Sequence, residues 1–378
     1  MVNRMVPMTD IQIPVELRPL DGRFGAGPSK IRPEQLDHLM AHQAVLGTSH
    51  RQAPVKDTVG RVRQGLAELF SLPDGYEVVL GNGGASAFWD VMAYGLIRSR
   101  SAHLSFGEFG SKCVDAARTP WLSAPAVTAS EPGDVGSFSV VEDADVYAWP
   151  HNETSTGAMA PVTRVEGAPD ALMLVDATSA AGGLSVDISQ TDAYCFSPQK
   201  NFASDGGLWW AVLSPAAIAR AEEIGNSSRY IPAFLDLHTA IDNSRLNQTL
   251  NTPALSTLLL MESQVEWMNS LGGLDACAER TSHNSNLLYQ WAEGHALLEP
   301  FVRETAHRSS VTVTIDVDPQ VDAQQLTGIL RHNGIVDTEP YRKLGRNQIR
   351  IATFVGVDSD DIERLIQSID FVLERLAN

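Results

Sequence analysis

Two side chains of opposite charge follow apolar segments that read as strands. Asp176 ends the apolar run 172–175, and Lys200 comes four residues after the apolar run 193–196. In an open α/β sheet, ligands bind beyond the carboxyl ends of the strands. We therefore expect both side chains to face one binding site. A surface lysine and a helix-capping aspartate would give the same local pattern, so this alternative stays open for the pair taken alone.

A lysine amine opposite a fixed carboxylate suits pyridoxal 5′-phosphate (PLP). The amine can form a Schiff base with the aldehyde, and the carboxylate can keep the pyridine nitrogen protonated so that the ring accepts electrons. Lys200 and Asp176 are therefore the candidate catalytic residues.

A glycine-rich segment, Leu80-Gly81-Asn82-Gly83-Gly84-Ala85-Ser86, leads from a predicted strand at 77–80 into a predicted amphipathic helix at 88–97. Backbone N–H groups of such a turn and the N-terminus of the next helix attract a phosphate, and the serine hydroxyl can add a hydrogen bond. The segment matches neither the GxGxxG dinucleotide pattern nor a P-loop, which ends in GK[ST]. A phosphate cradle and a purely structural turn are both compatible with it.

An aromatic and a polar segment follow two further predicted strands. Phe109 comes just after the strand predicted at 102–106, where its ring could stack on a flat cofactor, although a core phenylalanine would look the same. Asn152, Glu153 and Thr154 follow the strand predicted at 145–149. Their polarity indicates either a binding site or a capped turn.

Positive charge is concentrated in two places in a chain whose formal net charge is −18. The first is Arg51, in Ser49-His50-Arg51, and the second is the stretch 341–350, with Arg342, Lys343, Arg346 and Arg350. Arginine grips carboxylate and phosphate groups with two parallel hydrogen bonds. The clusters predict a substrate with several negative charges; a solvated basic loop is the alternative for the second.

Composition excludes several classes of function. The length of 378 residues favours two domains, and 46 acidic against 28 basic residues argue against nucleic acid or an anionic membrane as a partner. Cys113, Cys195 and Cys277 are too widely spaced for a disulfide framework or a zinc site, so we expect no metal. No signal peptide and no apolar run of about 18 residues is found, which predicts a cytoplasmic location.

Apolar residues at spacings of three and four predict a helix over 55–70, followed by alternating strands and helices. The strands are predicted at 77–80, 102–106, 145–149, 171–175, 193–196 and 208–213. Because strands that are apolar on both faces occur in parallel sheets covered by helices, we expect an α/β fold with a mostly parallel sheet.

From residue 252 onward the pattern changes. Long helices are predicted first, at 255–271 and 274–291; strands at 311–317 and 348–354 and helices at 323–331 and 361–376 follow. We predict a large domain over residues 17–265 and a small C-terminal α+β domain over 266–378, which residues 1–16 join.

Taken in order, these motifs resemble those of the phosphoserine aminotransferase family, in its actinobacterial branch, within the class V group of fold-type I PLP enzymes. The resemblance spans nearly the whole chain. It rests on Phe24-Gly25-Ala26-Gly27-Pro28-Ser29, Ser49-His50-Arg51, Gly83-Gly84-Ala85-Ser86, Asn152-Glu153-Thr154, Asp176, Ser197-Pro198-Gln199-Lys200-Asn201, Asn251-Thr252-Pro253 and the final arginine loop. It implies a large domain built on a mostly parallel seven-stranded sheet, plus the small C-terminal domain.

The resemblance implies a PLP-dependent transaminase of serine biosynthesis. Such an enzyme exchanges the amino group between L-glutamate and 3-phosphohydroxypyruvate, giving 2-oxoglutarate and O-phospho-L-serine. The sequence leaves open whether the related phosphorylated threonine precursor of pyridoxine biosynthesis is also a substrate.

The resemblance also implies roles for individual residues. Lys200 and Asp176 would be catalytic, and both would also hold the cofactor together with Ala85, Ser86, Phe109, Thr154, Gln199, Asn251 and Thr252. The substrate-binding residues would be Arg51, Arg342, Lys343 and Arg350. Asn251 and Thr252 match a motif that reaches the partner's cofactor, which implies a homodimer with shared active sites.

Three departures from the commoner family pattern stand out. Ser86 occupies a position where many members carry arginine, and Phe109 replaces a frequent tryptophan. The stretch between Lys343 and Arg350 aligns only with a one-residue insertion, so Arg342, Lys343 and Arg346 compete as phosphate ligands.

Other functions stay open on the residues alone. An alanine:glyoxylate or serine:pyruvate aminotransferase would share Lys200 and Asp176 but would not need the basic pair Arg342 and Lys343. A cysteine desulfurase would need a late loop cysteine, whereas Cys277 lies in a predicted helix. A non-catalytic phosphate- or nucleotide-binding module would use the glycine turn and the arginines without using Lys200.

Overall fold

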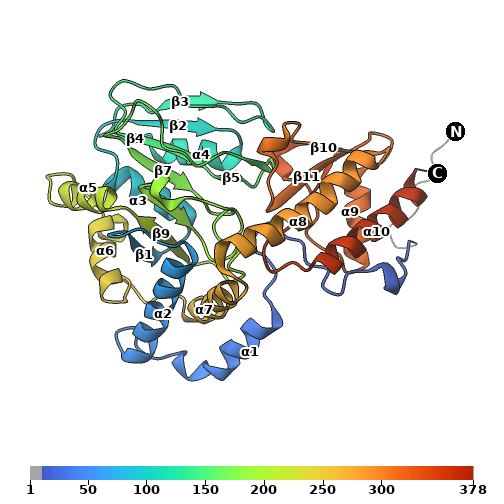
Figure 1. Ribbon diagram of the computed structural model, residues 1–378, viewed down its shortest axis with the longest axis horizontal. Helices are drawn as coiled ribbons and strands as arrows, with labels where there is room; N and C mark the ends of the chain where they lie inside the picture. Colours follow the sequence, from blue (N-terminus) through green and yellow to red (C-terminus); the bar gives the residue numbers. More distant parts are fainter. Residues whose placement is uncertain (1–10, 378) are drawn as a thin grey trace.

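The computed structural model describes residues 11–377, and its larger part is built on one seven-stranded sheet (Figure 1). The strand order is β1-β9-β8-β7-β4-β2-β3. The strands are β1 (Glu77–Asn82), β2 (Ser101–Ser105), β3 (Ala126–Ala129), β4 (Val146–Pro150), β7 (Leu172–Asp176), β8 (Ala193–Phe196) and β9 (Leu208–Leu213). Only β9 runs antiparallel to its neighbours. The predicted mostly parallel seven-stranded sheet is confirmed.

The strands are apolar on both faces because helices cover both faces. Alternate residues of β7 enter different clusters: Met173 and Val175 pack toward α2 and α7, whereas Leu172 and Leu174 pack toward the opposite helices. The helices of this part are α1 (Pro33–Ala41), α2 (Ala53–Leu69), α3 (Ala85–Gly95), α4 (Glu108–Ala116), α5 (Pro215–Gly225), α6 (Leu237–Arg245) and α7 (Leu255–Ser270). Of the described residues, none belongs to a helix long and apolar enough to cross a membrane.

The C-terminal part has its own apolar cluster and a three-stranded antiparallel sheet, β10-β11-β12. Its elements are α8 (Gly273–Gly294), β10 (Leu298–Pro300), β11 (Thr312–Val317), α9 (Ala323–His332), β12 (Gln348–Ala352) and α10 (Ser359–Leu376). In Figure 1 the long helix α8 leads from the large sheet to this part. Ile11 and Ile13 join the same cluster. These apolar clusters support the division of the chain into two domains, 17–265 and 266–378, which we propose. Residues 1–10, predicted to join the small domain, lie outside the described residues.

The starts of two helices bear on the site. α3 begins at Ala85 rather than at Phe88 as predicted, so Ser86 lies in its first turn. α4 begins at Glu108, so Phe109 lies in its first turn. Gly84 and Gly107 are the N-cap residues. Each helix thus presents its N-terminus at the carboxyl end of the preceding strand.

Candidate active site

A cavity of about 340 Å³ opens at the carboxyl ends of the parallel strands. It is lined by Gly84, Ala85, Ser86, Trp89, Phe109, Asn152, Thr154, Asp176, Thr178, Ser179, Gln199 and Lys200. These residues follow β1, β2, β4, β7 and β8 or end them, so five strands contribute to one site. Seven of the predicted site residues line this cavity: Ala85, Ser86, Phe109, Thr154, Asp176, Gln199 and Lys200.

Lys200 is buried, and its side chain lies against the glycine turn near the start of the described chain. Its Nζ donates a hydrogen bond to the carbonyl oxygen of Ala26. Gly27 has a φ of +144°, a backbone conformation that favours glycine, and a Cβ there would lie 2.1 Å from Nζ. The Ser29 Oγ donates to the Lys200 carbonyl oxygen at 2.6 Å, which holds the lysine backbone.

The lysine amine is prepared for chemistry by its surroundings. Burial lowers the pKa of Lys200 to about 8, and the nearby charge of Arg350 acts in the same direction. The carboxylates of Asp176 and Glu153 act in the opposite direction. A substantial uncharged fraction near neutral pH is what a nucleophilic or basic lysine needs.

This pKa predicts a pH dependence for the apoprotein. Reductive methylation of Lys200 by formaldehyde and cyanoborohydride should rise with pH through a midpoint of about 8, because only the neutral amine attacks the aldehyde. The Arg350→Gln variant should have a higher midpoint, since the lost positive charge no longer opposes protonation. Peptide mass spectrometry measures the modified fraction. A midpoint near 10.5, the ordinary value for lysine, would show that the amine is not perturbed.

Asp176 is held by donors on both carboxylate oxygens. The Thr178 backbone N and Oγ1 donate to Oδ1 at 2.9 and 2.5 Å, and Trp89 Nε1 donates to Oδ2 at 3.0 Å. Burial raises the pKa of Asp176, whereas the hydrogen bonds from Thr178 and Trp89 and the charge of Lys200 oppose this shift. The carboxylate therefore has a defined orientation in the same cavity as Lys200.

The glycine-rich segment forms one end of the cavity. Gly84 is extended at the N-cap of α3, and Ala85 and Ser86 occupy the first turn of that helix. The first N–H groups of an α-helix lack intrahelical partners and favour an anion. Gln199 Oε1 is buried without a hydrogen-bond partner among residues 11–377. The N–H groups and the Ser86 hydroxyl at the start of α3 suit an anionic ligand end.

Phe109 is positioned by a buried glutamate. Glu153 Oε2 accepts hydrogen bonds from the backbone N–H groups of Phe109 and Gly110, at 3.0 and 2.9 Å. A Cβ at Gly107 would lie 2.3 Å from the Glu153 side chain, so glycine is required at the N-cap of α4. Glu153 thus fixes the N-terminus of α4, the helix that carries Phe109, whose ring is predicted to stack on the cofactor.

Arg350 lies beside the cavity on β12, in the C-terminal part. Its Nη1 donates to the Thr154 carbonyl oxygen at 3.1 Å, and its guanidinium lies 5.5 Å from the ring centroid of Tyr341. The Tyr341 ring is 5.8 Å from that of Phe109. Arg350 Nε is buried without a partner among the described residues. The guanidinium therefore retains donor capacity next to the site.

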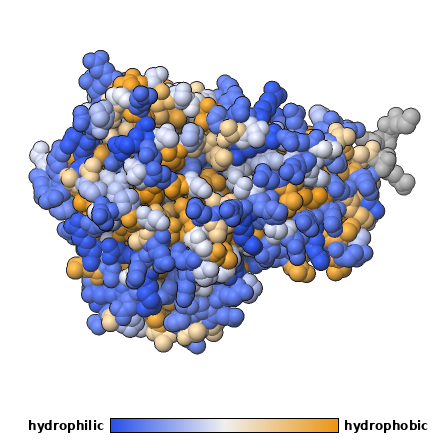
Figure 2. All heavy atoms as spheres, viewed as in Figure 1, coloured by the Kyte–Doolittle hydropathy of each residue, from blue (hydrophilic) through white to orange (hydrophobic). Residues whose placement is uncertain are grey.

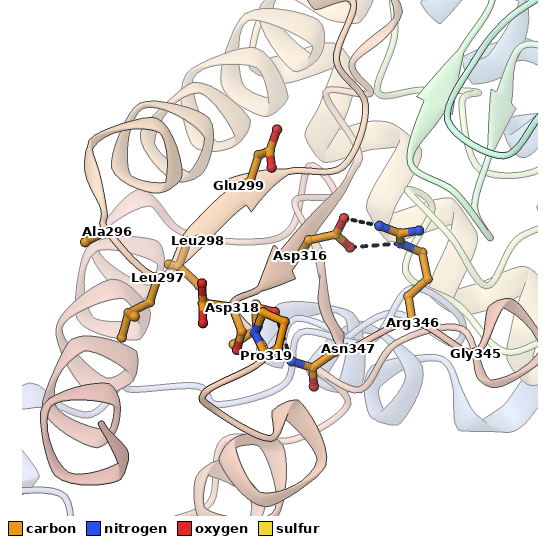
Figure 3. Close-up of a pocket in the computed structure, with 11 residues that line it drawn as sticks. Ala296, Leu297, Leu298, Glu299, Asp316, Asp318, Pro319, Gly345, Arg346 and Asn347 are labelled. Atoms are coloured by element: carbon orange, nitrogen blue, oxygen red, sulfur yellow. Dashed lines mark hydrogen bonds and ion pairs between the residues drawn. The ribbon is translucent and has the colours of Figure 1, made fainter. Parts of the chain in front are cut away.

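The remaining basic residues of this loop diverge. Lys343 pairs with Glu108 at the start of α4, close to the cavity mouth, and Lys112 contacts the same carboxylate at 3.3 Å. Arg346 pairs with Asp316 in a different cavity, of about 480 Å³, where Figure 3 shows the two side chains facing each other. Arg342 is exposed. The geometry favours Lys343 over Arg346 as a group near the site.

Arg51, Asn251 and Thr252 do not line the cavity of this chain. They lie near the end of β1: Arg51 Nη1 donates to Gln248 Oε1 at 2.5 Å, and the Asn251 N–H donates to Asn82 Oδ1 at 3.2 Å. Thr252 Oγ1 is 3.1 Å from His50 Nδ1. These side chains form a second polar group beside the glycine-rich turn.

Four polar or aromatic cavity residues were missed as site residues: Trp89, Asn152, Thr178 and Ser179. Asn152 Nδ2 and Thr154 Oγ1 both donate to Ser179 Oγ at 2.8 Å, and Asn152 Oδ1 is buried without a partner among residues 11–377. Asn152 stands in a motif that the sequence had marked. Trp89 carries no local signal, because its contact with Asp176 joins positions 87 residues apart.

The residues present fit PLP. A buried lysine amine, an oriented carboxylate, an aromatic ring and a helix N-terminus converge on one cavity. The unpartnered amide oxygens of Asn152 and Gln199 provide polar capacity that a ligand can satisfy. Among the described residues, no cluster of metal-ligating side chains is present.

Comparisons with known proteins find aminotransferases. The family model described as "Aminotransferase class-V" matches residues 24–338. The chain is 59% identical over 374 residues to a phosphoserine aminotransferase from Nocardioides, covering 98% of this chain and 100% of that one. A phosphoserine aminotransferase structure from Cytophaga hutchinsonii superposes with a TM-score of 0.85 at 22% identity, covering 93% of this chain and 99% of that one. An alanine–glyoxylate aminotransferase structure from Nostoc gives a TM-score of 0.77 at 19% identity, covering 98% of both chains.

Proposed function

The chain belongs to the class-V aminotransferase family, and we propose that it transfers an amino group between L-glutamate and 3-phosphohydroxypyruvate, giving 2-oxoglutarate and O-phospho-L-serine. The chain is a PLP-dependent enzyme, and its activity is phosphoserine transamination in serine biosynthesis. The observation that carries this conclusion is that Asp176, at the end of β7, and Lys200, just beyond the adjacent parallel strand β8, face one cavity.

PLP supplies an electron-accepting ring that stabilises negative charge at the substrate Cα. Lys200 would hold its aldehyde end, Asp176 its ring nitrogen, and Phe109 one face of the ring. Ala85 and Ser86, at the start of α3, and Gln199 would hold its phosphate, and Thr154 would donate a hydrogen bond near the ring oxygen. All of these side chains line the cavity.

Lys200 is also the group that moves the proton. With its amine free, Lys200 would remove the proton from the substrate Cα as a general base and would then deliver that proton as a general acid. The lowered pKa of about 8 suits this double role, because both protonation states are populated near neutral pH.

The cationic groups determine the substrate class. Arg350, whose Nη1 donates to the Thr154 carbonyl oxygen, would bind the substrate carboxylate. Arg342 and Lys343 would bind the substrate phosphate. The alanine:glyoxylate fold neighbour shows that the fold alone does not select the substrate. Lys343, which is exposed and pairs with Glu108 next to Phe109, favours a substrate with a second anionic group.

The second polar group supports a homodimer, which we propose. Arg51, Asn251 and Thr252 lie outside the cavity of their own chain, so we propose that they act at the partner's site, with Asn251 and Thr252 near the cofactor phosphate and Arg51 at the substrate anion. On the face drawn in Figure 2, hydrophilic residues predominate between scattered apolar patches. Exposed Tyr230, Phe234 and Leu246 flank α6 and offer apolar area for association. We further propose a cytoplasmic location.

The phosphate assignment makes a testable prediction. Arg342→Ala should raise the KM for 3-phosphohydroxypyruvate about tenfold or more and that for glutamate much less, because a charge-assisted hydrogen bond contributes about 1.5 to 3 kcal/mol. Lys343→Ala should act in the same direction. Arg346→Ala, which removes the arginine paired with Asp316, is the matched control. Equal effects of Arg342→Ala on both KM values would contradict the assignment.

The function itself is tested by a half-reaction. The PLP-loaded protein mixed with O-phospho-L-serine should lose its absorbance in the visible range and release 3-phosphohydroxypyruvate, detected by mass spectrometry. L-Alanine and glycine, which lack the second anion, should convert the cofactor at least about a hundredfold more slowly. A faster reaction with alanine would favour the alanine:glyoxylate alternative, and failure to bind PLP would favour the non-catalytic module.

A further inference from the structure

The two carboxylate oxygens of Asp176 are held by different parts of the chain. Both donors to Oδ1 come from Thr178, two residues along the same turn. The donor to Oδ2 is the indole Nε1–H of Trp89, on α3. A carboxylate oxygen accepts about two hydrogen bonds, so Oδ2 keeps an acceptor position besides the one that Trp89 fills. The turn at Thr178 therefore fixes Oδ1, and α3 fixes Oδ2, the oxygen that can accept a further hydrogen bond.

The same helix carries the predicted phosphate cradle. Ser86 lies in the first turn of α3, and Trp89 follows three residues later. Side chains at this spacing share a helix face, and both residues line the cavity. One rigid helical turn therefore sets the spacing between an anion at the helix N-terminus and the Asp176 carboxylate on β7.

The indole contributes a property that its bulk does not. Trp89 is 6% exposed and belongs to the apolar cluster on this side of the sheet, where a phenylalanine ring would also pack. Its N–H, however, is a donor that never titrates and has no acceptor function. It opposes the tendency of burial to protonate Asp176.

We propose that Trp89 is a positioning residue for the cofactor, whose indole N–H holds Asp176 Oδ2 directed at the pyridine nitrogen of PLP. The proposal rests on the proposed function, since it assigns the ligand of the same cavity. It adds that α3, the helix proposed to bind the cofactor phosphate, also orients the carboxylate that would hold the ring nitrogen.

Cofactor affinity tests the proposal without any measurement of activity. Apoprotein is titrated with PLP and with the 1-deaza analogue, in which a C–H replaces the ring nitrogen, and the dissociation constants are obtained from fluorescence. Trp89→Phe should weaken PLP binding about tenfold or more, because a hydrogen bond to a charged group is lost. It should change binding of the deaza analogue less than about threefold, since that ring has no nitrogen for Asp176 to hold.

Trp210→Phe is the matched control. Trp210 is a fully buried tryptophan on β9 whose Nε1 has no hydrogen-bond partner within residues 11–377, so its loss removes bulk but no such bond. It should affect both ligands equally. If Trp89→Phe does not fold, a benzothiophene side chain at position 89 removes the N–H without changing the shape.

The outcomes separate the inference from the function it rests on. If the Trp89 variants weaken the binding of PLP and of the deaza analogue by the same factor, the positioning role is overturned, and Trp89 contributes only by packing. A wild-type protein that binds neither ligand would instead overturn the proposed function.

Discussion

Replacement of Lys200 by alanine should lower turnover of the glutamate and 3-phosphohydroxypyruvate reaction by about 10³-fold or more. The variant loses both the amine that holds the cofactor and the base that moves the proton, and positioned acid–base catalysis alone contributes about 10²- to 10⁴-fold. Steady-state kinetics measure the loss. Borohydride treatment followed by peptide mass spectrometry should find the reduced cofactor on Lys200 in the wild type and on no lysine in the variant.

The control for this experiment is Lys56→Ala, which changes a partly exposed lysine on α2 outside the cavity. It should keep the wild-type rate and the same borohydride adduct. An added primary amine such as methylamine should restore part of the activity of Lys200→Ala, because the truncated side chain leaves space within a cavity of about 340 Å³. Wild-type turnover in Lys200→Ala would exclude the proposed mechanism.

Asp176→Asn should lower turnover by about 10²- to 10³-fold, a loss comparable to that of one oriented electrostatic contact at a reacting centre. The amide has nearly the same shape as the carboxylate, but it carries no charge with which to keep the pyridine nitrogen protonated. Its NH₂ group would face either Trp89 Nε1 or the Thr178 donors, all of which require an acceptor. Rapid-mixing kinetics of the half-reaction with O-phospho-L-serine measure the effect directly.

A cofactor with a fixed charge distinguishes electrostatics from misfolding. Asp176→Ala has room for a methyl group on the ring nitrogen, and PLP methylated there is permanently positive. Asp176→Ala should turn over at least about tenfold faster with this methylated cofactor than with PLP itself. Equal rates with the two cofactors would show that Asp176 acts by holding the turn around Thr178 and not through its charge.

The predicted fold agrees with the structure where the pattern was strongly apolar. The predicted bounds of β8 and β9 are those observed, since all their residues are buried and flanking polar residues mark both ends. The edge strand β3 (Ala126–Ala129) was not predicted, because three of its four residues are exposed and its pattern is that of a loop. α5 and α6 were also missed, although Ser214 and Asp236 cap them with side-chain hydrogen bonds.

The site was predictable to the extent that its residues follow strands. Asp176, Lys200, Phe109 and Thr154 each lie just beyond a strand, or at its last residue, and the parallel sheet brings those ends together. The positions of the side chains in the basic loop 341–350 could not be predicted in the same way. Its arginines are close in sequence, yet Arg350 points toward Thr154 and Arg346 toward Asp316, a divergence that depends on the partners each meets.

The amino-acid sequence by itself determined the chemistry of this protein: a lysine and an aspartate at the ends of apolar strands, a glycine turn before a helix, and cations for an anionic substrate. Residue type and local periodicity carry that information. Only the tertiary structure decided which neighbouring groups set the pKa and the orientation of these site residues. The lowered pKa of Lys200, the Trp89 donor to Asp176 and the Glu153 support of Phe109 depend on burial and on contacts between distant segments. Such contacts leave no local pattern, because they are created when the strands and helices pack.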